Sequence, residues 1–80
     1  MEEEAVQTHH DLAEFVRHLL RDYQADAGTW ENITLPDFLQ AMSAWIDDIG
    51  GWYANRGEAI PDHPSWATFA QILGAATVYE

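Results

Sequence analysis

Cysteine and lysine are both missing from this 80-residue sequence. Without cysteine the chain has no disulfide, no thiolate metal ligand and no cysteine nucleophile. No apolar run approaches the roughly 20 residues that a membrane-spanning helix needs. The acidic start, MEEEAVQTHH, also lacks the basic and apolar regions of a signal peptide. We therefore expect a cytoplasmic protein that does not enter a membrane.

Positive charge is scarce as well. Three arginines face 14 aspartates and glutamates, so the formal net charge is −11. A chain with so few cations cannot neutralise several phosphates, which excludes direct binding to nucleic acid. An acidic membrane surface would repel it too. If charge steers a partner to this protein, that partner is a basic protein or a metal ion. The alternative is that the acidity only keeps the protein soluble.

Large apolar side chains, in contrast, are abundant. Hydrophobic residues make up 48% of the chain and include four Trp, three Tyr and three Phe. An aromatic side chain buries roughly 150–250 Å², so these ten can supply much of a small core. The length allows a single domain, and no repeat or linker divides the sequence. We expect one domain over residues 1–80.

The first helix is predicted over residues 8–23. Thr8 suits the N-cap position, and Asp11 three residues later completes a capping box. Residues 1–7, which precede the cap, are expected to be frayed. The apolar residues that follow recur at the spacing of one helix face: Leu12, Phe15, Val16, Leu19, Leu20 and Tyr23.

The second helix is predicted over residues 34–49. Thr34 is a good N-cap, and Asp37 places a negative charge near the positive end of the helix dipole. Two adjacent glycines follow Ile49, and each costs roughly 1 kcal/mol inside a helix. The helix is therefore expected to end there, with an irregular extension that carries Trp52 and Tyr53 back onto the core.

The third helix is predicted over residues 64–79. Pro64 suits the first helical position, with His63 or Asp62 at the cap. The helix has almost no charge, which is typical of a helix buried by its neighbours or by a partner chain. Gly74 would allow another backbone to approach it closely.

The fold class that these patterns predict is all-α. No stretch shows the sustained alternation of a strand. We expect a compact three-helix domain whose two connections, about ten residues each, are long for helix–helix loops. Trp30, Ile33 and Ile60 are expected to pack these loops onto the helices.

One face of the first predicted helix carries candidate metal ligands. His10, Glu14 and His18 are spaced four residues apart, so they share a face. Two imidazoles and a carboxylate can bind Zn²⁺, although a tetrahedral site needs further ligands from elsewhere. The alternative is a solvated face with weak pairs between neighbouring charges.

Catalytic motifs are not recognisable. Ser43 and Ser65 are the only serines, and neither lies in a G-x-S-x-G context. The glycine pair at 50–51 lacks the flanking pattern of a phosphate-binding loop. We expect no cofactor and no enzymatic activity.

Spaced motifs nevertheless resemble those of a known family. An F-V-x-x-L-x-x-D helix precedes WEN-x-x-L-x-x-F-L-x-A-x-x-x-W, which is followed by Y-x-N-x-G, by PSW and by a final YE. This pattern is similar to that of a family of small bacterial domains of unknown function, over about residues 12–80. The resemblance implies a freestanding domain and carries no activity. By analogy, small acidic proteins of this kind are sometimes immunity or antitoxin-like partners.

The leading hypothesis is a non-enzymatic acidic module that binds a basic protein, as an immunity-like inhibitor does. The alternatives are a small-molecule or metal-binding domain, and a homo-oligomer that hides the apolar third helix; the chain itself would be a monomer or a weak homo-oligomer. The candidate binding residues are acidic groups and two possible aromatic anchors: Glu31, Asp37, Asp47, Asp48, Glu58, Trp52 and Tyr53.

Overall fold

Four α-helices and two short 3-10 helices make up the regular structure of the described residues. The computed structural model describes residues 2–79, so Met1 of the predicted frayed segment and Glu80 of the final YE pair lie outside the described residues. The elements, in chain order, are η1 (Glu3–Ala5), α1 (His9–Asp26), η2 (Ala27–Thr29), α2 (Leu35–Asp47), α3 (Ile49–Asn55) and α4 (Trp66–Ala76). The all-α prediction is confirmed, but the predicted count of three helices is one too low.

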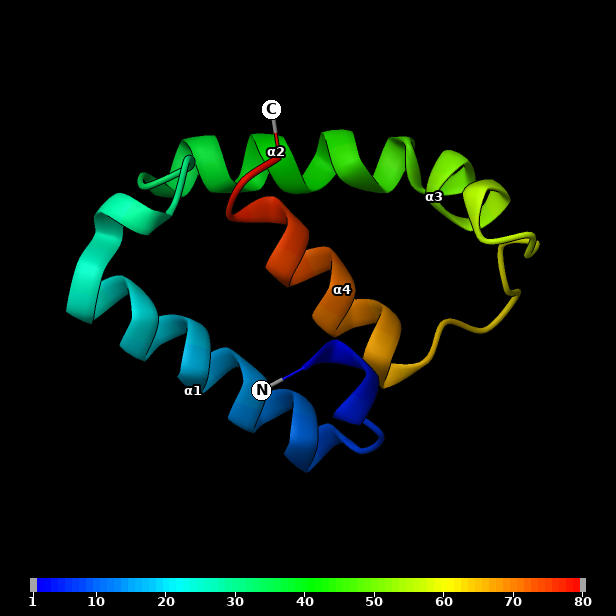
Figure 1. Ribbon diagram of the computed structural model, residues 1–80, viewed down its shortest axis with the longest axis horizontal. Coiled ribbons are helices and arrows are strands. Elements are labelled where there is room, and N and C mark those ends of the chain that lie inside the picture. The colour runs from blue at the N-terminus through cyan, green and yellow to red at the C-terminus, as the bar shows by residue number, and fades with distance from the viewer. Residues whose placement is uncertain (1, 80) are drawn as a thin grey trace.

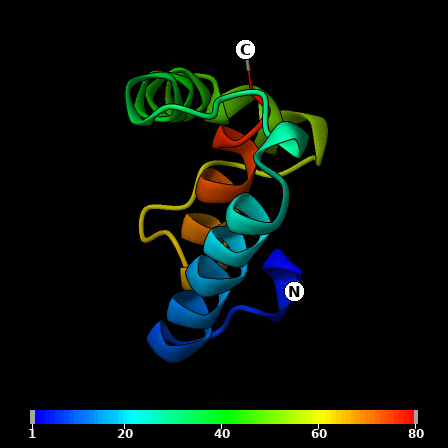
Figure 2. The same ribbon diagram turned by 90° about the vertical axis from the view of Figure 1, so that its left-hand side faces the viewer.

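Helix α4 lies at the centre of the molecule. Helices α1 and α2 both pack on α4, which runs between them (Figure 1). In the perpendicular view α1 and α4 lie side by side, and α2 crosses above them (Figure 2). The molecule measures 36 × 27 × 17 Å, so it is flat. None of the helices in residues 2–79 is both long and apolar enough to span a membrane.

Helix α1 begins as the sequence predicts. The Thr8 hydroxyl accepts a hydrogen bond from the Asp11 backbone N–H at 3.1 Å. The Asp11 carboxylate in turn accepts a hydrogen bond from the Gln7 N–H at 3.0 Å. In a usual capping box this carboxylate bonds to the N–H of the N-cap residue; here it bonds to the N–H of the residue before the cap. At the other end α1 continues three residues beyond Tyr23, to Asp26.

The predicted irregular extension of the second helix is a separate helix, α3. Thr34 caps α2 by accepting a hydrogen bond from the Asp37 N–H, as predicted. The break falls at Asp48, and the two glycines lie inside α3 rather than ending α2. A Cβ on Gly50 would lie 3.4 Å from the Ile60 side chain, so glycine lets the following loop pack closely against this helix.

Helix α4 is shorter than predicted. Ser65 is its N-cap, because the Ser65 hydroxyl accepts a hydrogen bond from the Thr68 N–H at 3.2 Å. Pro64 therefore precedes the cap, and neither His63 nor Asp62 occupies the cap position. The helix ends at Ala76, ahead of the predicted end at residue 79.

The described part of the segment expected to be frayed, residues 2–7, packs on the helices in this structure. Val6 is only 1% exposed and forms the centre of the core with Phe15 and Ala70. Partly buried leucines surround these three: Leu12, Leu19 and Leu73. The 3-10 helix η1 packs on α4, because the small side chains of α4 leave room for it.

Gly74 permits the close approach that the sequence predicts, but the approaching groups are side chains rather than a backbone. A Cβ on Gly74 would lie 2.9 Å from the Glu3 Oε1 and 3.5 Å from the Phe15 ring. A larger residue at this position would therefore require the Glu3 carboxylate to move away from α4.

Only one of the three residues predicted to hold the loops is largely covered. The Trp30 ring stacks on Phe38 with a centroid separation of 5.7 Å and meets the edge of Tyr23 at 5.2 Å. Ile33 and Ile60 remain about half exposed, at 49% and 56%. The prediction was therefore right for Trp30, whereas the two isoleucines stay on the surface.

Candidate functional site

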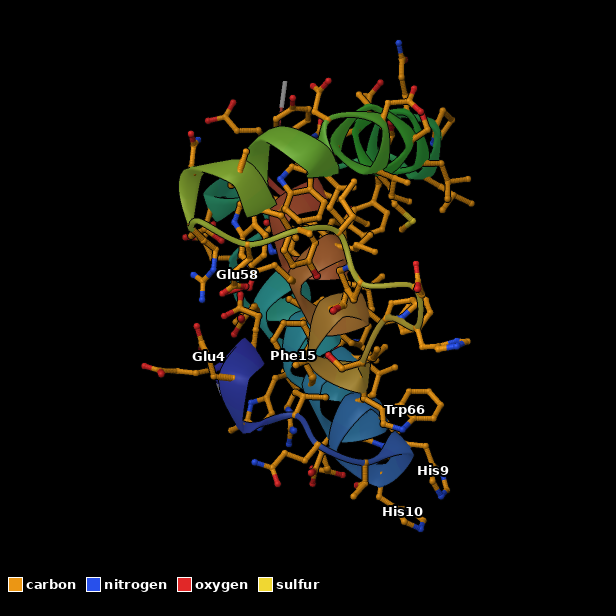
Figure 3. The ribbon with its side chains drawn as sticks, turned by 90° about the vertical axis from the view of Figure 1, so that its right-hand side faces the viewer. Glu4, His9, His10, Phe15, Glu58 and Trp66 are labelled. Carbon is orange, nitrogen blue, oxygen red and sulfur yellow. The ribbon has the colours of Figure 1, made fainter. Side chains whose placement is uncertain are left out.

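An acidic hollow with an aromatic wall lies between η1, α3 and the first half of α4. Its volume is about 310 Å³. Glu3 and Glu4 of η1, Trp52 and Tyr53 of α3, and Glu58 from the following loop all line it. The side chains of Glu4 and Glu58 lie on the same side of the molecule (Figure 3). Segments more than 50 positions apart in the sequence therefore contribute carboxylates to one hollow.

Tyr53 fixes the wall of this acidic hollow. Its ring meets the Trp52 ring edge to face, with centroids 4.9 Å apart, and its hydroxyl lies 3.1 Å from the Thr68 Oγ1. The hydroxyl pair ties α3 to α4. Tyr53 is only 7% exposed, so it packs against its neighbours, as expected of a residue carried back onto the core, and shows little surface to a partner. Trp52 is half-buried, and it offers the accessible aromatic surface.

The charges in the hollow are mainly negative. Three glutamates line it, and its single arginine is Arg56. The Arg56 guanidinium lies 4.6 Å above the Trp52 ring, in the geometry of a cation–π contact. Its Nε is 3.8 Å from a Glu58 carboxylate oxygen, and both side chains are about half exposed. Such an exposed pair contributes at most about 1 kcal/mol. The hollow therefore already holds one cationic group, Arg56, between an aromatic ring and a carboxylate, and it has two further glutamates, Glu3 and Glu4, in its lining.

The structure brings only three of the seven predicted binding residues together. Trp52, Tyr53 and Glu58 line the acidic hollow. The remaining four lie outside its lining: Glu31, Asp37, Asp47 and Asp48. Glu31 precedes α2, Asp37 lies in the first turn of α2, and Asp47 is the last residue of that helix; all three are exposed.

Asp48 has a structural partner. The Tyr79 hydroxyl donates a hydrogen bond to the Asp48 Oδ2, which holds the C-terminal segment against the junction of α2 and α3. This hydrogen bond, with the negative charge of Asp48 and partial desolvation, raises the pKa of the Tyr79 phenol above its ordinary value. Asp48 therefore connects two distant segments of the chain.

The predicted metal-binding face does not form a site in the described part of the chain. Within residues 2–79 no three His or carboxylate side chains are grouped so that they could hold a metal ion. His10, Glu14 and His18 are all exposed on α1. Glu14 forms an ion pair with Arg17, one turn away. The His9 and His10 ring centroids are 4.2 Å apart. Both side chains lie at the N-terminal end of α1 (Figure 3).

Sequence reasoning missed Glu3 and Glu4, because the segment that carries them was expected to be frayed. One signal was available. Val6 is an isolated apolar residue shortly before the Thr8 cap, and an apolar residue near this position often packs against the first turns of the helix. Once Val6 is buried, η1 must lie against α4.

Comparison with known proteins identifies the family. A model described as "Family of unknown function (DUF7660)" matches residues 8–80. The chain belongs to DUF7660. The match includes α1 to α4 and the connections between them, so the resemblance to an uncharacterised domain family is confirmed. No curated protein and no solved structure matches this DUF7660 chain. The function of the family is unknown.

Proposed function

We propose that this DUF7660 protein is a non-enzymatic module that binds a basic protein, with a lysine or arginine side chain of the partner entering the acidic hollow. The observation that carries the proposal is the convergence of Glu3, Glu4 and Glu58 beside the exposed surface of Trp52. Carboxylates attract a cation, and an aromatic face adds cation–π stabilisation. The overall charge of −11 would speed the approach of a basic partner.

The serines support the non-enzymatic part of the proposal. The Ser43 hydroxyl donates to the Gln40 carbonyl oxygen at 2.8 Å, and the Ser65 hydroxyl caps α4. Both hydroxyls thus serve local helix structure. The acidic hollow itself contains one histidine, His63, and no serine–histidine hydrogen bond.

A titration with a hexa-arginine peptide, followed through the Trp52 indole resonance, tests the proposal. Saturable shifts are expected at Trp52, and they should weaken as salt rises because the attraction between exposed charges is screened. Glu58→Gln should weaken binding several-fold. Asp47→Asn makes the same charge change outside the hollow and should have little effect.

Two outcomes would contradict this proposal. One is the absence of any saturable shift at Trp52. The other is an equal loss of affinity in Glu58→Gln and Asp47→Asn, since it would show attraction to net charge without a defined site.

The volume of the hollow favours a second candidate, a small cationic ligand. About 310 Å³ lies at the lower end of the range for small-molecule sites. Spermidine in place of the peptide tests this candidate. Saturation by spermidine at concentrations well below those needed for hexa-arginine would favour the small ligand over the protein partner.

A further inference from the structure

A second surface of the molecule is apolar and uncovered. Eleven large hydrophobic side chains are at least 38% exposed. Eight of them line two hollows, and we call these eight the apolar face: Val16, Leu20, Tyr23, Ile33, Leu35, Ile46, Ile60 and Phe69. Soluble monomers rarely expose contiguous apolar patches larger than a few hundred Å², so such a surface calls for an occupant.

Both hollows of the apolar face border α4. The larger, about 420 Å³, lies between α1 and α2 and includes Leu73 of α4 in its lining. The smaller, about 170 Å³, lies between α4, α3 and the loop before α4, and includes Phe69. Phe69 and Leu73 are one helical turn apart, so they lie on the same side of α4.

The smaller hollow of the apolar face adjoins the acidic hollow, because Tyr53, Pro61 and Thr68 line both. The larger hollow shares no lining residue with the acidic hollow. The Trp66 ring lies 6.2 Å from that of Phe69, and Trp66 projects from the side of the molecule opposite to Glu4 and Glu58 (Figure 3). No residue that lines either apolar hollow carries a charge. An occupant of the larger apolar hollow therefore meets none of the carboxylates that line the acidic hollow.

The flat chain exposes more surface than a compact monomer of its mass. The accessible surface is 5453 Å². A compact monomer of this mass, 9.1 kDa, exposes about 4900 Å², so this chain exposes about 550 Å² more. If each copy buried an equal area of its apolar face, the interface would total about 1100 Å², just above the roughly 1000 Å² that a specific interface should clear.

We infer that the apolar face docks on the same face of a second copy, forming a two-fold symmetric homodimer. A two-fold interface places the same patch of both copies in contact, so one uncharged apolar patch is sufficient. The absence of charge in the lining gives a basic partner no advantage at this face. A second copy supplies the matching apolar area without any further component.

Salt separates this inference from the proposed function. Each copy carries a charge of −11, so the two copies repel each other, and added salt should strengthen the dimer by screening that repulsion. Binding of a cation in the acidic hollow should weaken under the same change. The two proposals can therefore fail independently.

Sedimentation equilibrium of the full chain between about 5 and 200 µM tests the dimer, since self-association depends on concentration. The expected mass rises from 9.1 kDa toward twice that value, and the transition moves to lower concentration in higher salt. Leu20→Glu places a charge on the apolar face and should leave the chain monomeric at every concentration. Val78→Glu makes the same charge change at an exposed residue that lines neither hollow. The Val78→Glu variant should therefore still dimerise.

Far-UV circular dichroism of both variants establishes that they are folded. Leu20 is 53% exposed and Val78 52%, so neither substitution removes a core side chain. A wild-type chain that is monomeric at 200 µM would overturn the inference. So would a dimer that survives Leu20→Glu, an equal loss of dimer in Val78→Glu, or growth into open-ended oligomers. A monomer that instead binds an amphipathic helical peptide at Leu20 would assign the face to a different protein.

Discussion

The side-chain amide of Asn32 donates a hydrogen bond to the carbonyl oxygen of Tyr79 at 2.8 Å, across 47 positions of the sequence. The same amide group also donates to the Ala76 carbonyl at 2.9 Å. The backbone N–H groups of Glu31 and Asn32 both donate to the Thr77 carbonyl. The loop before α2 thus satisfies the carbonyl groups that α4 leaves without helical partners at its C-terminal end. The WEN motif is therefore a structural motif.

Asn32→Ala should destabilise the protein by about 1–3 kcal/mol, because two carbonyl groups in a partly buried region lose their donor. Urea unfolding measures the effect. Glu31→Ala is the matched control: the Glu31 side chain is exposed, and its backbone N–H keeps its bond to Thr77. An equal loss of stability in both variants would show that the Asn32 side chain has no special role.

Val6→Ala should lower the free energy of unfolding by roughly 1.5–3 kcal/mol, the range expected for a fully buried valine side chain. Thermal and urea unfolding provide the measurement. Val78→Ala removes the same atoms from a side chain that is about half exposed, and its effect should be much smaller. If the two variants were equally stable, η1 would not be held on α4 in solution.

The Tyr79–Asp48 hydrogen bond should make stability depend on pH at the alkaline end. The pKa of Tyr79 is raised in the folded state, so the unfolded state loses this proton first and stability falls as pH rises. The contribution is full below the ordinary tyrosine pKa of about 10 and is lost as pH rises through the folded value. Asp48→Asn should lower the pKa of Tyr79 in a spectrophotometric titration. Asp47→Asn, one residue away, should leave that titration unchanged.

Trp30→Ala should lower the free energy of unfolding by about 2–4 kcal/mol. This loss is somewhat smaller than for the same substitution at a fully buried tryptophan, because Trp30 is half-buried between Tyr23 and Phe38. Trp30→Phe keeps a ring in the stack and should restore most of that loss. Chemical denaturation compares the two variants. A near-neutral Trp30→Ala would mean that the ring is not part of the packed structure, and a functional role for the WEN stretch would have to be considered again.

The starts of α1 and α2 could be predicted because their signals are local. Thr8 and Thr34 each bond to a backbone N–H three residues ahead, and this relationship is visible in the sequence as a capping pattern. The start of α4 was missed by two residues because two local signals compete there. Pro64 suits a first turn, but the Ser65 hydroxyl reaches the Thr68 N–H and sets the boundary.

The remaining differences depend on contacts between distant segments. Burial of Val6 requires the space that α1 and α4 leave between them, and no local pattern encodes that space. The acidic hollow likewise joins Glu3 and Glu4 to a loop more than 50 positions later. Helical periodicity identifies which face of each helix is apolar, but it does not say how much of that face a flat arrangement leaves uncovered.

The central position of α4 has a consequence for synthesis on the ribosome. Helices α1 and α2 find their packing surface mainly on α4, which follows both of them in the chain. They emerge first and must wait, with their apolar stripes exposed, until α4 has left the exit tunnel. Folding of this domain therefore cannot be completed before α4 has emerged, and the apolar stripes of α1 and α2 stay open to other contacts until then.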